Sequence, residues 1–179
     1  MAEQPEFSRF LRMNERGDGS RERTIGATAG GRAALARRFG LRALDRLEAR
    51  LTAAPEAGGA HIAGTLVADL VQACVATDED VPAHLDVRFA IRFVRGLDEN
   101  GVGGGEEEVE LSDEDCDLLP LEDDRIDLGE AVAQTLALNL DPYPRAPDAD
   151  SALRALGVLS EGEAGPMAAA LRGLKLKKD

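Results

Sequence analysis

Residues 85–93 read LDVRFAIRF, and this stretch decides the fold. Its apolar side chains recur at every second position and alternate with charged or small ones. That period is typical of a β-strand with one buried face. The apolar set is Leu85, Val87, Phe89, Ile91 and Phe93. We therefore predict a strand here, with this set on the core face.

A longer apolar run, residues 61–77 (HIAGTLVADLVQACVAT), precedes that strand. It is rich in β-branched residues and apolar on both parities, as expected for a central strand. Turn signals bound it, with Gly58 and Gly59 before it and residues 78–82 (DEDVP) after it. Residues 47–53 also alternate, so three consecutive strands with short turns predict an antiparallel meander.

The stretch between residues 32 and 51 allows two interpretations. It could form one long helix. Alternatively, residues 32–39 form a short helix, because they are good helix formers and Gly40 follows where a helix cap is expected. Period-two alternation then begins at Leu47, which is typical of a strand. We favour the short helix followed by the strand.

A second helix is predicted over residues 128–140. Asp127 and Glu130 form an Asp-x-x-Glu pair close to a capping box, which would satisfy N–H groups of the first turn. Val132, Leu136 and Leu140 share one stripe, as in an amphipathic helix. The sequence DPYPR at residues 141–145 ends the helix, because proline cannot continue the hydrogen-bond ladder.

These segments predict an α+β fold. It is a twisted antiparallel sheet, a meander of about three to five strands, packed by two or three short helices. Residues 6–13 and 23–28 are weaker strand candidates, and residues 167–175 could form a last helix. We expect a single domain with a core of residues 5–95 and 125–145. Residues 96–124 hold 13 acids and no Lys or Arg, so we predict a long acidic disordered loop there. Residues 146–179 are predicted to be a loose C-terminal segment.

The net charge of −13 is unevenly distributed. Residues 1–50 carry +4, residues 51–169 carry −20, and residues 170–179 carry +3. Phosphate binding by the whole body is disfavoured, because affinity for nucleic acids comes largely from Lys and Arg. Only the two ends are basic enough for it. The acidic middle fits a basic partner, or it serves solubility alone.

The expected compartment is the cytoplasm. The first thirty residues contain no apolar run of the kind a signal peptide needs, and no stretch of the chain is apolar for long enough to span a bilayer. Two cysteines, Cys74 and Cys116, do not make a disulfide framework. We therefore expect reduced thiols and no membrane partner.

No motif predicts catalysis, so we expect no catalytic residue, no cofactor and no metal. His61 and His84 fit solvated or capping positions better than a catalytic pair with a nucleophile. Residues 113–117 (DEDCD) mimic the start of a calcium loop, but Leu118 stands where glycine is needed. The sequence GVGGG at residues 101–105 lacks the Gly-Lys-Ser/Thr of a phosphate loop.

Three blocks of the chain resemble the YceD family, in the form found in α-proteobacteria. They are QACVATDEDV at 72–81, IDLGEAVAQTLALNLDPYPR at 126–145 and MAAALRGLK at 167–175, and the likeness covers roughly residues 32–179. The resemblance implies a non-enzymatic factor needed for accumulation of 23S ribosomal RNA. Many family members carry Cys-x-x-Cys where this chain has Cys74 and then Thr77. A thiolate zinc site is therefore not expected, and Cys74 is interpreted as a core residue.

The leading hypothesis is a ribosome-biogenesis factor that binds ribosomal RNA, a pre-ribosomal particle or another assembly partner, and not DNA. The candidate contacts are Tyr143, Arg145, Lys175, Lys177 and Lys178. Tyr143 could stack on a base, enter a partner's pocket or pack back on the preceding helix. The alternative is an acidic chaperone-like module that binds a basic ribosomal protein. A third class, a hydrolase or nuclease, would need its clustered acids to hold a metal in a segment too loose for that geometry.

Overall fold

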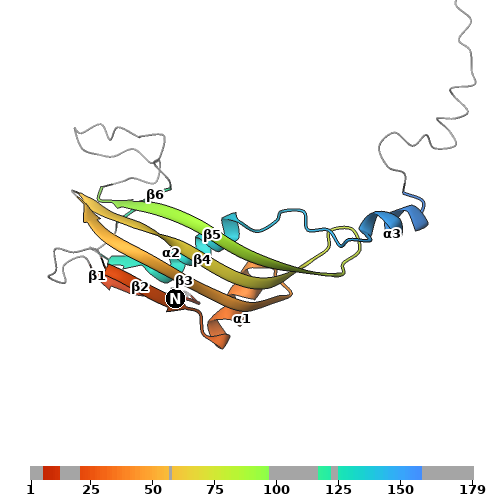
Figure 1. The fold of residues 1–179 in the computed structure, drawn as a ribbon, viewed down its shortest axis with the longest axis horizontal. Helices are drawn as coiled ribbons and strands as arrows, with labels where there is room; N and C mark the ends of the chain where they lie inside the picture. The colour runs from red at the N-terminus through yellow and green to blue at the C-terminus, as the bar shows by residue number, and fades with distance from the viewer. Residues whose placement is uncertain (1–5, 13–20, 57, 97–116, 122–124, 159–179) are drawn as a thin grey trace, which may run out of the picture. The chain divides into compact units, whose positions relative to one another are not determined.

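The computed structural model describes residues 6–12, 21–56, 58–96, 117–121 and 125–158. They belong to two compact units (Figure 1). The first unit falls within Met1–Gln72 and Pro82–Pro142 and holds most of the sheet and two helices. The second falls within Ala73–Val81 and Tyr143–Asp179.

The main sheet has five strands in the order β2-β3-β4-β5-β6. Their bounds are β2 Arg21–Gly26, β3 Ala43–Glu56, β4 Gly59–Ala73, β5 Asp80–Val94 and β6 Leu118–Pro120. The pairs β2–β3 and β3–β4 are antiparallel, whereas β6 pairs with β5 in parallel. The predicted α+β fold with its meander is therefore confirmed, and the parallel β6 makes the sheet mixed.

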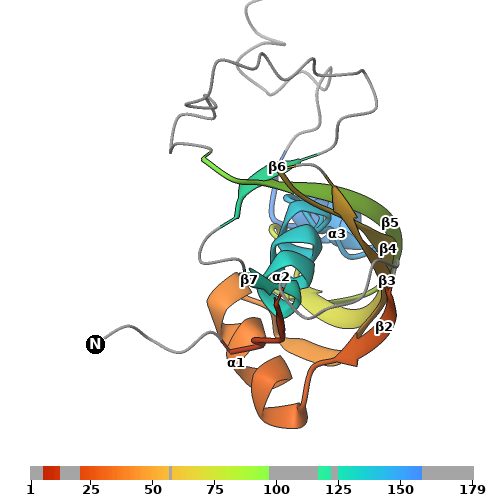
Figure 2. The same ribbon diagram turned by 90° about the vertical axis from the view of Figure 1, so that its left-hand side faces the viewer.

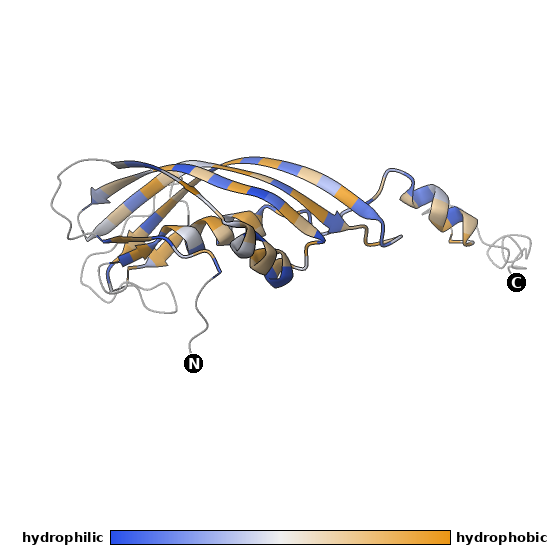
Figure 3. Cartoon of the chain, turned by 90° about the horizontal axis from the view of Figure 1, so that it is seen from below, coloured by the Kyte–Doolittle hydropathy of each residue, from blue (hydrophilic) through white to orange (hydrophobic). Residues whose placement is uncertain are grey.

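Strict alternation explains the buried face of the sheet. Along β3, Leu47, Ala49 and Leu51 are buried, whereas Glu48 and Arg50 between them are exposed. The same banding follows the other long strands (Figure 3). Alternate side chains of a strand point to opposite faces, so this pattern gives one apolar face and one polar face.

Helix α1, Ala29–Phe39, confirms the short helix followed by a strand. The Thr28 side chain accepts a hydrogen bond from the Gly31 N–H at its start. Gly40 ends the helix in the left-handed conformation, with φ of 66°, which glycine adopts without steric cost. The chain then turns directly into β3.

Helix α2, Leu128–Leu138, lies on the inner side of the curved sheet (Figure 2). Val132 and Leu136 of the predicted stripe are fully buried there, whereas Leu140 lies past the end of the helix and is only partly buried. Asp127 caps the helix as predicted, because its carboxylate accepts hydrogen bonds from the N–H groups of Gly129 and Glu130.

Some predictions of the outer segments were wrong. The strand predicted at residues 6–13 is shorter in the structure, where β1 covers only Phe10–Arg12. It pairs with β7, Arg125–Asp127, in a separate two-stranded sheet. β6 lies inside the segment predicted as a loop, where the apolar Leu118 and Leu119 join the edge of β5. Residues 97–116 of that segment lie outside the described residues, as does the helix predicted at 167–175.

The second unit contains the turn between β4 and β5 and helix α3, Ala149–Ala155. Its small core consists of Cys74, Ala146 and Ala149. A backbone hydrogen bond of 2.9 Å from the Val75 N–H to the Pro144 carbonyl joins its two segments. Within the segment predicted to be loose, residues 146–179, helix α3 is a correction, because Ala149 gains a buried site in this core. Among the described helices, none has the length and apolar character to span a membrane.

Candidate nucleic-acid interface

Three arginines, Arg32, Arg37 and Arg42, line a shallow hollow of about 320 Å³ formed by α1 and the start of β3. We call these three residues the arginine surface. Arg37 and Arg42 are exposed, and Arg32 is half-buried. The chain as a whole has a net charge of −13. A local group of three arginines is therefore a candidate binding site for an anionic partner.

The local sequence explains why the arginines gather there. Helix α1 buries Leu35 and Ala36 against the core, which leaves the arginines toward solvent. The rest of the hollow is lined largely by small side chains, those of Ala29, Ala33, Ala36 and Ala43. The Arg32 guanidinium donates to the Ala27 carbonyl at 2.9 Å, which orients it. A phosphodiester backbone can therefore approach the helix closely and meet guanidinium groups.

The neighbouring Arg38 binds carboxylates of the chain itself. Its guanidinium donates to both carboxylate oxygens of Glu130, at 2.7 and 2.9 Å, and contacts Glu6 at 3.4 Å. The hydrogen bonds with Glu130 raise the pKa of Arg38, and the same contact lowers the pKa of Glu130. Arg38 therefore ties α1 to α2 and is not part of the arginine surface.

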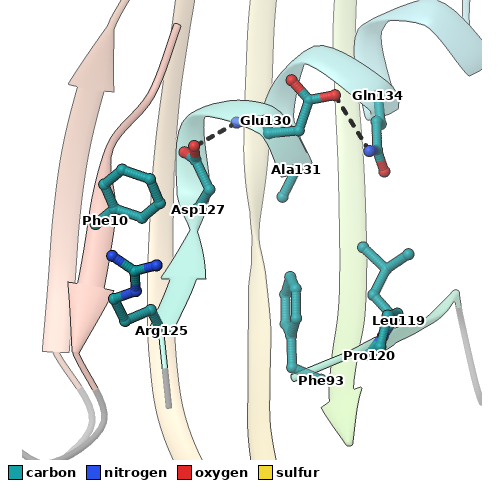
Figure 4. Close-up of a pocket in the computed structure, with 9 residues that line it drawn as sticks. All are labelled: Phe10, Phe93, Leu119, Pro120, Arg125, Asp127, Glu130, Ala131 and Gln134. Atoms are coloured by element: carbon teal, nitrogen blue, oxygen red, sulfur yellow. Dashed lines mark hydrogen bonds between the residues drawn. The ribbon is translucent and has the colours of Figure 1, made fainter. Parts of the chain in front are cut away.

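A second hollow, also of about 320 Å³, lies between the N-terminal end of α2 and the edge strands (Figure 4). Phe93, Leu119 and Pro120 form an apolar wall. Phe10 is 59% exposed, and the Arg125 guanidinium lies 5.2 Å from its ring centroid. This exposed aromatic and cationic pair offers a face on which a flat group could stack.

The N-terminus of α2 is occupied by the chain itself. One oxygen of Asp127 accepts from the backbone N–H groups of Arg9 at 2.8 Å, Gly129 at 3.0 Å and Glu130 at 3.2 Å. The other oxygen accepts from the Ser8 hydroxyl. This carboxylate takes the place that a phosphate would need, so the helix N-terminus is no anion site.

The structure places only two of the candidate contacts predicted from the sequence. Tyr143 is 73% exposed in the second unit. Arg145 forms an ion pair with Asp150 of the same unit, so its carboxylate partner lies within the chain. Lys175, Lys177 and Lys178 lie outside the described residues. The described residues therefore do not unite the predicted set.

Cys74 is a core residue, as predicted. It is 3% exposed, and its sulfur accepts a hydrogen bond from the Ala146 N–H at 3.2 Å. Hydrogen bonds from the Thr77 side chain and from the Ala146 N–H lower the pKa of the thiol to about 7.

His84 contacts a single carboxylate. His84 Nδ1 lies 2.6 Å from Asp69 Oδ1 on the polar face of the sheet, where both side chains are exposed. In the part of the chain that the structure describes, no three His, Cys, Asp or Glu side chains are grouped to hold a metal ion.

Sequence reasoning missed the arginine surface. From the sequence, residues 1–50, with a charge of +4, and residues 170–179, with +3, were basic enough for phosphate binding, but no surface could be located within them. The available signal was a predicted helix with three arginines directly followed by a fourth, Arg42, in the next turn. Only the fold shows that Arg38 binds Glu130 and is therefore not part of this group.

The chain was compared with protein families, curated proteins and solved structures. A family model described as "Large ribosomal RNA subunit accumulation protein YceD" matches residues 62–175, which is more than half of the chain. No curated protein and no solved structure matched the chain.

Proposed function

Because the chain belongs to the YceD family of large ribosomal RNA subunit accumulation proteins, we propose that it supports accumulation of this RNA by binding RNA directly. The observation that carries the proposal is the arginine surface on an otherwise acidic chain. The family is not known as a family of enzymes. In this proposal the chain acts in the cytoplasm by contact alone, on ribosomal RNA or a pre-ribosomal particle.

The strength of such binding can be estimated from counterion release. Three phosphate contacts give a slope of log affinity against log salt of about −2 to −3. That is too shallow for tight binding by these contacts alone. Tyr143, Arg145, Lys175, Lys177 and Lys178 remain proposed additional contacts, through stacking and further phosphate neutralisation.

The test removes the charge of the arginine surface. Arg32, Arg37 and Arg42 are changed together to Gln, and binding to fragments of large-subunit ribosomal RNA is measured over a salt series. We expect weaker binding, and a salt slope that is shallower by about 2 to 3. The reason is that binding of the variant releases about one counterion fewer from the RNA for each arginine removed.

A matched control removes the same number of charges elsewhere. Arg23, Arg46 and Arg50 are arginines of β2 and β3 with exposed side chains, and they are changed to Gln in the control. Its affinity for RNA should stay close to that of the unmodified protein. An equal loss of affinity in both triple variants would mean that only net charge matters, and the proposed interface would be wrong.

A second candidate function rests on the opposite charge. Residues 51–169 carry 26 acids and only 6 arginines. An acidic composition of this kind suits a chaperone-like module that binds one basic ribosomal protein. RNA is negatively charged, whereas a basic ribosomal protein is positively charged. Removing positive charge from the arginine surface should therefore weaken binding of RNA and strengthen binding of a basic protein.

A further inference from the structure

Among the residues that the structure describes, strand β5 has an edge that is open along most of its length. β6 pairs only with its last residues, Arg92, Phe93 and Val94. Along residues 83–91, β4 is the neighbour on one side, and among the described residues no strand pairs with the other side. The core-facing side chains of this stretch remain partly buried, whereas those of β4 on the same face are fully buried. The partly buried set is Ala83, Leu85, Val87 and Phe89.

The contact with β6 shows which backbone groups face this edge. The N–H of Arg92 donates to the Asp117 carbonyl at 3.0 Å, on the β6 side. In a strand, the N–H and C=O of one residue point to the same side, and alternate residues point to opposite sides. The even-numbered residues of β5 therefore direct their backbone groups to the open edge. They are His84, Asp86, Arg88 and Ala90.

We propose that this edge pairs with the same edge of a second copy of the chain, antiparallel and with the two-fold axis at Val87. The stretch LDVRF, residues 85–89, is self-complementary under that symmetry. Asp86 lies opposite Arg88 of the second copy, and Arg88 opposite Asp86 of the second copy. Opposite charges directly across a strand pair stabilise it. Such an isologous contact closes on itself as a dimer.

The backbone pattern and the ends of the open stretch agree with the same axis. Asp86 and Arg88 both direct their N–H and C=O toward the edge, so they can exchange both hydrogen bonds across it. The paired stretch runs from Ala83 to Ile91, and Ala83 lies opposite Ile91 of the second copy. It stops where β6 already occupies Arg92 and where Pro82 has no N–H to donate. On the core face, Leu85 meets Phe89, and Val87 meets its own copy.

The side-chain charges are available for this pairing. Within the described residues neither Asp86 nor Arg88 forms an ion pair, and both are exposed. Other charged side chains on the polar face of the sheet are paired inside the chain, such as Arg46 with Glu48 at 2.7 Å. The inference does not depend on RNA binding.

The test is a charge exchange, read out by sedimentation equilibrium of the full chain over a range of concentrations. The unmodified protein should show a monomer–dimer equilibrium. Asp86→Arg and Arg88→Asp each place two like-charged pairs across the axis, and each should raise the dimer dissociation constant at least about tenfold. The double variant D86R/R88D restores opposite charges at both positions. It should dimerise about as well as the unmodified protein.

A backbone variant and a control complete the design. Ala90→Pro removes an N–H that points to the open edge, so it should weaken the dimer without removing a hydrogen bond to β4. Arg50→Asp, an exposed charge reversal on β3, should leave dimerisation unchanged. Far-UV circular dichroism confirms that each variant is folded.

Three results would overturn the proposal. One is a protein that stays monomeric at every concentration. Another is a dimer that neither single charge variant weakens, or that the double exchange fails to restore. The third comes from hydrogen exchange: concentration-independent protection of the amides of His84, Asp86 and Arg88 would mean that another part of the same chain covers this edge.

Discussion

Gly129 stands where two backbones approach more closely than any side chain allows. A Cβ at this position would lie 1.8 Å from the Phe7 carbonyl oxygen. The close approach brings the segment around Ser8 and Arg9 onto the start of α2, where both donate to Asp127. The absence of a side chain at one residue thus fixes where the N-terminal segment crosses the helix.

Gly129→Ala should therefore destabilise the protein. The new methyl group meets backbone atoms that cannot rotate away, so either the N-terminal segment or the helix must shift. We expect a loss of about 1–3 kcal/mol in the free energy of unfolding, measured in urea. Gly30→Ala is the control, since its Cβ would have no neighbour within 4 Å. That change should be neutral or stabilise by up to about 1 kcal/mol, and an equal loss in both variants would refute the steric explanation.

The Cys74 thiol gives a second prediction for a single residue. Its pKa of about 7 is due first to the hydrogen bond from the Thr77 side chain. In a Cys116→Ser background, the ultraviolet absorbance of the thiolate should rise with a midpoint near that pH. Thr77→Val should move the midpoint upward, because the anion loses its main donor. Thr65→Val, on β4, should leave the midpoint in place, and a midpoint insensitive to Thr77→Val would contradict this assignment.

At the scale of elements, one ion pair joins the two helices of the first unit. Arg38 of α1 contacts Glu130 of α2, and the contact lowers the pKa of the carboxyl group. A group whose pKa is lower in the folded state stabilises the fold above its unfolded pKa. That contribution is lost as the pH falls through the folded pKa.

Glu130→Gln should cost about 0.5–1 kcal/mol of unfolding free energy near neutral pH, a modest value because both side chains are partly exposed and solvent screens them. The difference from the unmodified protein should shrink as the pH falls through the lowered pKa of Glu130, because the carboxyl group itself then becomes protonated. Glu48→Gln breaks a more exposed pair within β3 and should cost less. A difference for Glu130→Gln that stays constant with pH would show that charge is not the cause.

Elements with a clear local period could be predicted from the sequence. A few neighbouring residues are enough to indicate each of these features. They are the alternation of β3 and β5, the glycine that ends α1 and the Asp127 cap of α2. The three-residue strands β6 and β7 could not be predicted, because such short strands depend on their partners and not on their own pattern.

The same limit applied to the candidate site. The Asp-x-x-Glu spacing suggested that Glu130 serves the helix cap, but its carboxylate binds Arg38, 92 positions away in the sequence. No local spacing encodes that contact. For the same reason the arginine surface emerged only once the fold had separated Arg38 from its neighbours.

At the scale of the whole molecule, two charge regions compete for the choice of partner. The arginine surface favours an anion, whereas residues 96–124 contribute 13 acids and no basic residue. Charges act on one another over about 8 Å at physiological ionic strength and over longer distances in dilute salt. The balance between an RNA partner and a basic protein partner should therefore shift when either region is altered.

Neutralising part of the acidic region separates the two proposed functions. Changing Glu106, Glu107, Glu108 and Glu110 to Gln removes four negative charges from a chain of net charge −13. If the chain binds RNA, the variant should bind ribosomal RNA fragments several-fold more tightly at about 50 mM salt, because repulsion of phosphate is reduced. If it binds a basic ribosomal protein, that affinity should fall, since the attracting charge is lost. Changing Glu22, Glu48, Asp141 and Asp148 to amides removes the same charge elsewhere and serves as the control. A loss of RNA binding in the acidic-region variant would contradict the RNA proposal, since no phosphate contact has been removed.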